Sequence, residues 1–353
     1  MSDWKFSIKE FGKVDDEVRR LLDDAVTSSA DSHVFFHPAL MEAWIETYRP
    51  LRHIDFFIVT GNSHNNHVVF PMALWRRNWK HAFLKNIIAI GYSDYDYHDP
   101  LFQRIPDNAE IKQFLEELKV FLQNQFSFDI ICLDGVTDNV LPSSEGWVQN
   151  EMCPYLDLKD IDNEEALMSF FSTSLRGDIR RQIRRINEHG ELRIVEYRDF
   201  ESIPKDTCAE FMRQHTLRWP NAYKAPHFHE NLLKYGLKEG VVHFSVLKCG
   251  DVEIAWHLGF SFNGTYYYYM PAGNQDYLKF SPVKIHLYHL VLRAIKLGYA
   301  TFDHLRGDET YKSGWSNGYK HVNSLTVTSK DSKTTLKRKI MNIRRYITAL
   351  PQK

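Results

Sequence analysis

The chain has 353 residues, of which 14% are aromatic, and its formal net charge at pH 7 is -1. This length is enough for two domains of ordinary size, and the aromatic content excludes a disordered protein. The near-zero charge gives no general attraction for nucleic acid or for an anionic membrane.

The sequence shows no signal for export or for membrane insertion. Its start lacks a basic region followed by an apolar one, and no apolar run reaches the roughly 18 to 20 residues that cross a bilayer. The four cysteines are widely spaced, which is typical of reduced thiols. We therefore predict a soluble cytoplasmic protein with no integral membrane segment.

The first half of the sequence predicts three strands, a helix and a further strand. Residues 55–61 and 67–75 are apolar runs joined by a turn-rich pentapeptide, which indicates a β-hairpin. Residues 86–91 form a third apolar run. Residues 108–126 place apolar side chains at helical spacing, and a buried strand is expected at 128–135.

The second half predicts the same order of elements. Strands are expected at 241–248, 252–260, 264–273 and 299–307. A helix is expected at 281–298, with Ser281 as its cap, Pro282 at its first position and Gly298 as its stop.

Both halves therefore predict one β-β-β-α-β unit, and we interpret the chain as a duplication. Coincidence remains the alternative, since a hairpin followed by a helix is common. The last helix and strand of each unit form a right-handed parallel crossover, while the other strands are mostly antiparallel. The expected fold class is α/β (α+β). It has two tandem domains, 1–160 and 161–353, each a mixed, mostly antiparallel sheet flanked by helices.

A basic amphipathic helix is expected between the halves, at 174–188. Leucine and isoleucines share one face, and five arginines cover the rest. Arg176 and Arg180, nearest the helix start, are suited to bind substrate phosphates through their forked N–H groups. The alternative is an ordinary solvated face. A second basic helix is expected at 334–350.

A loop rich in tyrosine and aspartate follows the third strand of the first half. Its candidates for an acceptor pocket are Tyr92, Asp94, Tyr95, Tyr97 and Asp99. Tyrosine rings suit a sugar or a base, and carboxylates bind hydroxyls or a protonated amine. Asp94 is the preferred catalytic carboxylate on the acceptor side. The alternative is a turn whose rings pack on the sheet.

Two histidines of the second half are candidate site residues. His257 shares one strand face with Gly259, because alternate residues of a strand point the same way. His215 lies in the stretch "HTLRW", which ends at Trp219, and we assign this pair to substrate binding. Both histidines could equally be hydrogen-bonded residues of the interior.

The stretch "FDHLRGDETYKSGW", residues 302–315, gathers charged and aromatic residues behind an apolar strand. A short helix is expected after Asp308. Asp303, Arg306 and Glu309 could form an ion network that holds the loop, and Tyr311 and Lys312 remain as candidates for chemistry.

Several stretches in this order resemble the FemAB/CelD-like, double-domain branch of the Gcn5-related N-acetyltransferase (GNAT) superfamily. The stretches that carry the resemblance are 35–48, 91–102, 174–186, 215–219, 277–282 and 302–315. The resemblance covers most of the chain and implies two tandem GNAT-like domains. It also implies transfer of an acyl or aminoacyl group to an amine, from acyl-CoA in some members and aminoacyl-tRNA in others.

The resemblance implies that an acyl pantetheine arm lies between splayed strands of the second domain. The residues that would then contact CoA are Tyr268, Met270, Ser281 and Lys284. Relatives often have glycine at the helix start, where this chain has Val283. The first-turn N–H groups and the helix dipole still make an anion site.

The resemblance also implies catalytic roles. His257 would face the reacting centre, and Tyr311 would protonate the leaving thiolate. Lys312 would hold developing negative charge, and Glu309 would contact substrate.

Three functions are therefore open. The leading hypothesis is an acyl-CoA-dependent N-acyltransferase that transfers an acetyl or hydroxybutanoyl group to a dTDP- or UDP-linked amino sugar for surface glycan (O-antigen) biosynthesis. Its partners are small molecules, not nucleic acid. The second is an aminoacyl-tRNA-dependent peptidoglycan ligase, and the third is a non-catalytic glycan- or membrane-surface-binding protein. No zinc pattern appears, so no metal is expected.

Overall fold

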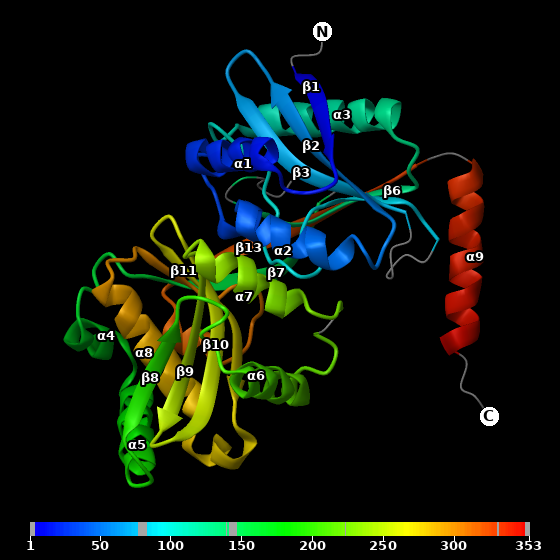
Figure 1. Ribbon diagram of the computed structural model, residues 1–353. Coiled ribbons are helices and arrows are strands. Elements are labelled where there is room, and N and C mark those ends of the chain that lie inside the picture. Colours follow the sequence, from blue (N-terminus) through cyan, green and yellow to red (C-terminus); the bar gives the residue numbers. More distant parts are fainter. Residues whose placement is uncertain are drawn as a thin grey trace. The chain divides into compact units, whose positions relative to one another are not determined.

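The computed structural model describes residues 4–76, 83–138, 140, 147–222, 224–329 and 332–349 (Figure 1). The chain divides into two compact units. Unit 1 comprises Met1–Asn150 and Val322–Lys353, and unit 2 comprises Glu151–His321. This division differs from the expected one at 160/161, because the chain returns to unit 1 at its C-terminal end.

Unit 1 is a mixed sheet with helices on both faces. Its elements are β1 (Lys5–Phe11), α1 (Asp16–Ser28), η1 (Val34–Phe36), α2 (Pro38–Tyr48), β2 (Ile54–Asn62), β3 (His67–Trp75), β4 (Asn86–Ala89), β5 (Leu101–Phe102), α3 (Asn108–Gln125), β6 (Ile130–Thr137), β13 (Gly318–Thr328) and α9 (Ser332–Ala349). The strand order is β1-β2-β3-β4-β6-β13, and β5 pairs with β3. β4 and β6 are parallel and the other neighbours are antiparallel. The predicted hairpin and crossover are confirmed.

Neighbouring residues of β2 show how the helices cover the sheet. Phe56 contacts Trp44 of α2, with ring centroids 6.2 Å apart. Phe57 points to the opposite face and contacts Phe126 at the end of α3, at 4.6 Å. Alternation along the strand therefore buries α2 and α3 against opposite faces.

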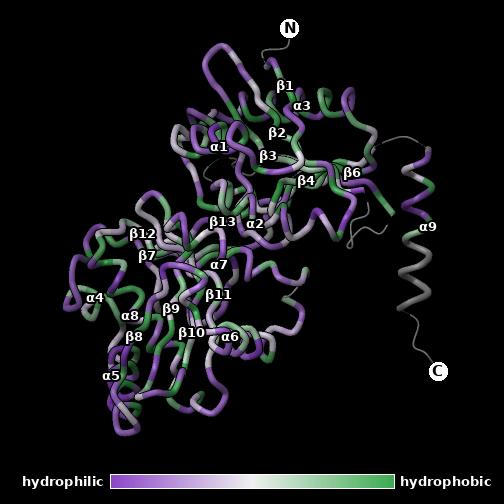
Figure 2. The backbone as a smooth tube through the Cα atoms, in the orientation of Figure 1, coloured by the Kyte–Doolittle hydropathy of each residue, from purple (hydrophilic) through white to green (hydrophobic). Residues whose placement is uncertain are grey.

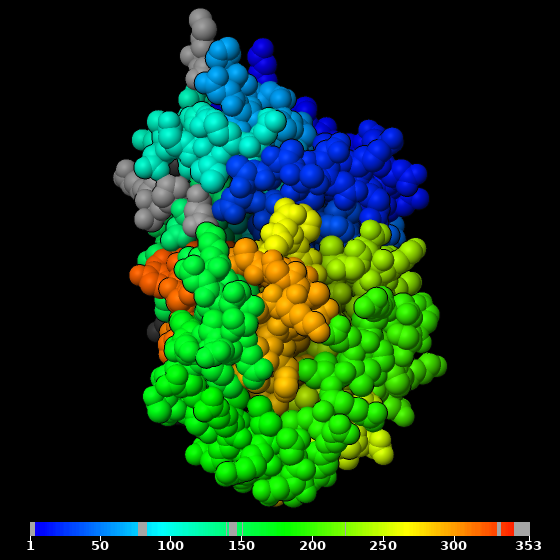
Figure 3. Space-filling model, turned by 90° about the vertical axis from the view of Figure 1, so that its left-hand side faces the viewer, coloured from blue at the N-terminus to red at the C-terminus, as the bar shows by residue number. Residues whose placement is uncertain are grey.

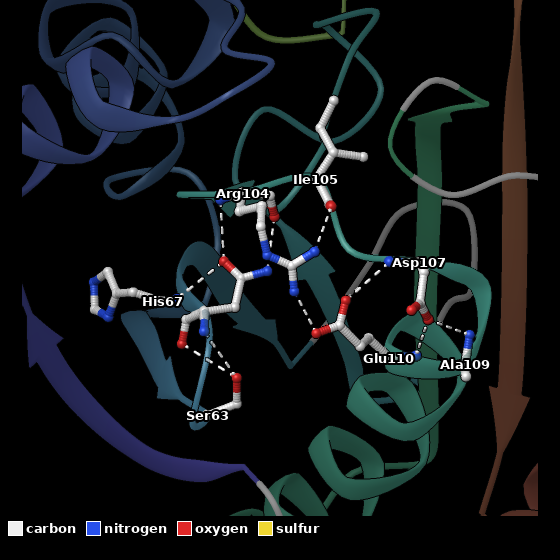
Figure 4. Close-up of polar contacts among 8 residues, drawn as sticks. Ser63, His67, Arg104, Ile105, Asp107, Ala109 and Glu110 are labelled. Carbon is white, nitrogen blue, oxygen red and sulfur yellow. Dashed lines mark hydrogen bonds and ion pairs between the residues drawn. The ribbon is translucent and has the colours of Figure 1, made fainter.

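A polar network fixes the entry to α3 (Figure 4). The Asn66 side chain donates to the Arg104 carbonyl at 2.7 Å and accepts from the Arg104 N–H at 3.1 Å. The Arg104 guanidinium contacts both the Ile105 carbonyl and the Glu110 carboxylate. Asp107 caps the helix in a capping box with Glu110.

Unit 2 has the same kind of sheet. Its elements are β7 (Val148–Asp157), α4 (Glu164–Phe170), α5 (Thr173–Asn187), β8 (Leu192–Tyr197), α6 (Lys205–Arg218), α7 (Phe228–Lys238), β9 (Val242–Cys249), β10 (Val252–Phe262), β11 (Thr265–Gly273), η2 (Gln275–Phe280), α8 (Pro282–Lys296), β12 (Thr301–Asp303) and η3 (Lys312–Trp315). The strand order is β7-β12-β11-β10-β9-β8, with β11 and β12 parallel and the others antiparallel.

The two faces of this sheet carry different helices. Phe244 of β9 packs on Phe211 of α6, with ring centroids 5.3 Å apart. The next residue, Ser245, faces α8 and lies 3.0 Å from His286 Nε2. Apolar colours gather along the strands in Figure 2, whereas α5 is drawn mainly in hydrophilic colour. On α5, Ile179 and Ile186 are buried, whereas Arg180, Arg181 and Arg184 are exposed.

Three details of unit 2 correct the expected elements. Ser281 precedes α8 in a left-handed conformation (φ 51) and makes no side-chain cap bond, whereas Gly298 (φ 72) does end the helix. The strand expected at 299–307 is only β12, Thr301–Asp303. The helix expected after Asp308 begins at Lys312.

Among the described residues, no helix is both long and apolar enough to cross a membrane.

Candidate functional site: an opening between two parallel strands

The parallel pair β11 and β12 separates after three residues. The last pair is Tyr267 with Asp303, although β11 continues to Gly273. Past Asp303, the chain keeps only its neighbour on the other side, β7, where the His304 N–H donates to the Pro154 carbonyl at 3.0 Å. The β11 backbone from Tyr268 onward therefore loses its neighbour on this side, and we call this place the opening.

A bulge lies at the same point of β11. Leu258 of β10 pairs with Met270, while Phe260 pairs with Tyr267. One residue of β10 thus faces two of β11, Tyr268 and Tyr269. A bulge bends a strand and re-aims its side chains, so it helps to separate β11 from β12.

Buried aromatic rings line the inner side of the opening. The His257 ring stacks on Tyr268, with centroids 4.5 Å apart and planes 9° apart. His304 contacts the same tyrosine edge-on at 6.1 Å. Burial lowers the pKa of His304 to about 4, against the opposing effect of its hydrogen bond to the Trp315 carbonyl. His257 and His304 are therefore neutral at pH 7.

A second group of side chains surrounds the outer side. Burial raises the pKa of Tyr311 well above its ordinary value, and the Glu309 carboxylate adds to this effect. Burial also raises the pKa of Tyr268, and Tyr311 adds to it. The Arg218 guanidinium opposes both shifts, which places it near both tyrosines. Tyr311 is 40% exposed, so a neutral phenol faces solvent here.

Lys312 holds the loop rather than facing the opening. Its side chain is 4% exposed. Nζ donates to the Arg306 carbonyl at 2.6 Å and lies 3.4 Å from the carbonyls of Leu305 and Gly307. Glu309 completes the cage at 2.8 Å. An ammonium with these contacts is fully occupied, so this geometry gives Lys312 a structural role.

Asp303 was expected to form an ion network with Arg306 and Glu309, and the structure gives it the charged partner Lys320. The Asp303 carboxylate pairs with Lys320 at 3.0 Å and accepts from the Leu305 N–H at 2.8 Å. Leu305 has φ 60, a conformation that costs a branched residue energy. These contacts fix the point at which β12 ends.

The end of α6 carries two predicted site residues, His215 and Trp219, and their neighbour Arg218. His215 is buried, and burial lowers its pKa to about 4, with Arg218 adding to the shift. Trp219 is 43% exposed, and the Arg218 guanidinium lies 5.6 Å from its ring centroid. His215 is thus an interior histidine, while Trp219 offers an exposed ring for a ligand.

At the start of α8, the side chains of Lys284 and Val283 are held by contacts within unit 2. Lys284 pairs with Asp178 of α5 at 2.5 Å, and this hydrogen bond is the main cause that lowers the pKa of Asp178. A Cβ at Gly273 would meet Val283 Cγ2 at 2.7 Å, so Val283 packs directly on the β11 backbone. Ser281 is partly exposed and remains the polar residue at this turn.

A groove of about 1480 Å³ lies along α4, α5 and α8. Figure 3 looks onto the side of unit 2 on which α8 (orange) reaches the surface. Arg176, Arg180 and Arg184 line the groove at helical spacing. Arg176 donates to the Met168 carbonyl at 3.2 Å and to Thr173 at 3.1 Å. Within the described part of the chain, Arg180 and Arg184 have no ion-pair partner. We call this feature the arginine groove.

The predicted acceptor loop of unit 1 is mostly interior. Tyr92, Tyr95 and Tyr97 are each less than 5% exposed, and the Tyr95 hydroxyl donates to the Leu40 carbonyl at 2.6 Å. Asp99 is also buried and accepts from the N–H of Thr137 at 2.6 Å. The rings therefore pack on the sheet, which was the alternative interpretation of this loop.

Asp94 differs from its neighbours in the loop. It is partly exposed, and its Oδ2 accepts from the Trp44 indole at 3.0 Å and from the Tyr48 hydroxyl at 2.7 Å. Two rigid donors hold the carboxylate in one orientation. It can therefore act as an oriented acceptor of hydrogen bonds.

The structure does not place all predicted residues together. Tyr268, Met270, His257, Tyr311 and Glu309 belong to the opening or its lining. Arg218, which the sequence interpretation passed over, lies with them. Its position at the end of a predicted helix, next to an aromatic residue, was the signal available.

The comparisons with known proteins agree with this fold. Residues 173–313 match the family model described as an acetyltransferase (GNAT) domain. They form a GNAT acetyltransferase domain. A comparison with curated proteins gives no match.

Solved structures resemble the whole chain. The crystal structure of FemX has a TM-score of 0.59 at 13% identity, over 88% of this chain and 96% of that chain. L-PGS from Bacillus licheniformis has 0.52 at 11%, over 96% and 99%. A tandem GNAT protein from the clavulanic acid biosynthesis pathway has 0.52 at 10%, over 93% and 100%. The chain thus shares the fold of these structures over most of its length, and its second half contains the match to the acetyltransferase (GNAT) domain.

Proposed function

We propose that this protein is an N-acyltransferase that uses acyl-CoA as its donor and the amino group of a nucleotide-linked sugar as its acceptor. The opening between β11 and β12 carries the proposal, because two parallel strands separate there beside a neutral, partly exposed tyrosine. The reaction would serve surface glycan (O-antigen) biosynthesis in the cytoplasm.

The opening suits a thioester. The pairing of β11 with β12 ends at Tyr267, and a backbone N–H group at such a separation would polarise the carbonyl. Tyr268 and Met270 would flank the pantetheine arm, and Ser281 and Lys284 would lie toward the phosphates. Acetyl or a short hydroxyacyl group such as hydroxybutanoyl is the proposed cargo.

Tyr311 is the proposed acid. The amine nitrogen attacks the thioester carbon, the C–S bond breaks, and the thiolate takes the phenol proton. Because the pKa of Tyr311 is raised, the phenol carries its proton at pH 7 and can donate it. The Arg218 guanidinium nearby would stabilise the phenolate until solvent restores the proton.

The arginine groove supports an acceptor with a diphosphate, such as a dTDP- or UDP-linked amino sugar. Arg180 and Arg184 are exposed, and unpaired guanidinium groups bind phosphate oxygens in a bidentate manner. Trp219 would stack on a ring of the substrate. In unit 1, Asp94 remains our proposed carboxylate for the acceptor amine.

Calorimetry with CoA, followed by a thiol-release assay across nucleotide amino sugars, tests the proposal. We expect Tyr311→Phe to lower kcat by about 10²-fold or more, whereas the exposed Tyr319→Phe leaves it unchanged. Arg180→Ala with Arg184→Ala should raise KM for the sugar nucleotide at least tenfold and leave KM for acyl-CoA within about twofold.

Arg181→Ala is the control for the groove, because Arg181 already pairs with Asp178. No binding of CoA at millimolar concentration would exclude the proposed donor. Equal effects of all three arginine substitutions on both substrates would exclude the groove as the acceptor site.

A further inference from the structure

Four polar side chains form a chain of contacts inside unit 2. His243 Nε2 of β9 lies 3.6 Å from Oε1 of Glu196 on β8. His243 Nδ1 lies 2.7 Å from the Tyr266 hydroxyl, which lies 3.2 Å from His257 Nδ1. We call Glu196, His243, Tyr266 and His257 the buried relay. Its Glu196 end is partly exposed, and both histidines and the tyrosine are buried.

The carboxylate end favours one direction for the hydrogen bonds of the relay. The Glu196 carboxylate lies 3.6 Å from His243 Nε2, which is a charge contact beyond hydrogen-bond distance. The contact with His243 lowers the pKa of Glu196 to about 2, and Arg293 adds to the effect. The negative charge of this carboxylate favours the tautomer of His243 with its proton on Nε2 and a bare Nδ1. The single hydroxyl proton of Tyr266 then points to His243. The Tyr266 oxygen accepts from His257, whose proton must be on Nδ1.

His257 Nε2 therefore carries no proton and has a free lone pair. Burial lowers the pKa of His257 well below its ordinary value, so the ring is neutral and this nitrogen carries no proton. The residue is 0% exposed, and no described residue donates to its Nε2. Unpaired buried acceptors are costly and rare in proteins. A bound water or a substrate N–H could therefore donate to this nitrogen.

His257 is linked to the opening through its contact with Tyr268. Its ring stacks on Tyr268 at 4.5 Å, the first β11 residue past the last pair with β12. On the α8 side, the His286 ring lies 6.3 Å away, and its Nε2 contacts Ser245 at 3.0 Å. A Cβ at Gly259 would come within 2.4 Å of His257 Cε1, so this glycine leaves the room that the ring occupies.

We propose that His257 Nε2 accepts the proton that the substrate amine loses, directly or through one bound water, and that the buried relay carries this charge toward the surface at Glu196. This inference rests on the proposed N-acyl transfer, and it adds a base and an exit path to it.

The proton balance closes within the chain. When the amine nitrogen has bonded to the thioester carbon, its N–H proton moves to His257 Nε2. The Nδ1 proton of His257 moves to the Tyr266 oxygen, and the Tyr266 hydroxyl proton moves to His243 Nδ1. His243 is then an imidazolium beside the Glu196 carboxylate, which stays ionised. Loss of the His243 Nε2 proton to solvent leaves the two histidines in the opposite tautomers, with a proton on His257 Nε2. The relay returns to its first state when His243 Nε2 takes up a proton from solvent, both hydrogen bonds to Tyr266 reverse, and His257 Nε2 releases its proton into the opening.

The groups that set this charge come from four strands and one helix. Glu196 and Arg293 are the charged groups at the outer end. Tyr268, His286 and Tyr299 are the titratable groups around the inner end. The neighbouring His286 also lowers the pKa of His257, so a positive charge is more stable at His243, beside its carboxylate.

Nitrogen-15 NMR of the histidine side chains tests the relay without any substrate. At pH 7 we expect His257 to show a protonated Nδ1 and a bare Nε2, and Tyr266→Phe to abolish this preference. A protonated Nε2 on His257 in the unaltered protein would overturn the proposal, whatever the enzyme's activity.

Kinetics tests the role of the relay. At saturating substrates, we expect Tyr266→Phe and His243→Asn each to lower kcat more than tenfold, with KM for acyl-CoA within about twofold. The double variant should lose no more than the worse single variant, because both changes cut one path. Tyr319→Phe, at an exposed tyrosine outside the opening, is the control and should keep its rate.

The outcomes separate this inference from the proposed function. Unchanged kcat in Tyr266→Phe, together with active transfer in the unaltered protein, overturns the relay and leaves the N-acyl transfer standing. Fully additive losses, or losses confined to stability, also overturn it. Absence of transfer from every acyl-CoA tested removes the proposed function and the catalytic role of the relay with it, while the tautomer remains measurable.

Discussion

At the scale of single residues, the structure separates side chains that hold the site from those that can react. Lys312 is the clearest case. Its ammonium contacts three backbone carbonyls and the Glu309 carboxylate, and it is buried. A lysine in such a cage keeps a turn closed and has no free donor for a substrate.

Replacement of this lysine should therefore destabilise the fold. We expect Lys312→Met to lower the free energy of unfolding by about 2 to 4 kcal/mol, since it leaves buried carbonyls and a carboxylate unpaired. Glu309→Gln should cost under about 1 kcal/mol, because that carboxylate is 39% exposed and the amide keeps an acceptor. Urea unfolding measures both. A Lys312→Met protein as stable as the unaltered one, but inactive, would favour a chemical role instead.

The sequence predicted residue types better than it predicted exposure. Tyr92, Tyr95 and Tyr97 stand in a polar stretch, and nothing local shows that their rings turn inward onto the sheet. Asp94 was singled out in the same stretch, yet its partners Trp44 and Tyr48 come from α2. Such contacts between distant segments carry no signal in a single sequence.

At the scale of elements, two glycines differ in the room they leave for an alanine methyl group, Gly259 in a strand and Gly177 in a helix. We expect Gly259→Ala in β10 to lower the free energy of unfolding by about 1 to 3 kcal/mol. Its Cβ would lie 2.4 Å from His257 Cε1 and 2.7 Å from the Tyr267 carbonyl oxygen. Gly177→Ala in α5 meets nothing within 4 Å and should raise this free energy by about 0.5 to 1 kcal/mol.

Thermal unfolding of the two variants, side by side, checks this pair. Equal stability of both would mean that β10 and β11 shift apart to accept the methyl group. A stable Gly259→Ala protein with an altered His257 tautomer would show that the ring has moved instead of the strand.

The strand that ends the second half was predicted too long, and the reason is physical. Residues 299–307 are apolar enough for a strand, but only Thr301–Asp303 pairs with β11. Beyond it, backbone bonds to β7 and the positive φ of Leu305 lead the chain away. The opening exists because of this departure, so the error in the predicted strand marks the candidate site.

At the scale of the whole molecule, repetition of the β-β-β-α-β order was readable, but the division into units was not. β13 pairs with β6, so Val322–Lys353 belongs to unit 1. When two strands are far apart in the sequence, nothing local shows that they pair, because each strand shows only its own alternation of apolar and polar residues. The sequence therefore predicted two similar units and assigned the last strand and helix to the other one.

Acid should destabilise this protein strongly, because unit 2 buries many neutral histidines. Seven have pKa values below the ordinary one, chiefly through burial: His215, His229, His243, His257, His286, His289 and His304. The pKa falls to about 3 for His229 and His286 and to about 4 for His215 and His304. In the unfolded chain each binds a proton near pH 6.5.

The unfolded state thus binds more protons than the folded state between about pH 6.5 and 4, and stability falls as pH falls through this window. Each such histidine contributes up to about 1.4 kcal/mol per pH unit. Urea unfolding at a series of pH values should show an uptake of several protons. His304→Gln, whose amide can replace the bond to Trp315, should lower that uptake by about one. A flat profile from pH 7 to 5 would show that these histidines become protonated within the folded protein.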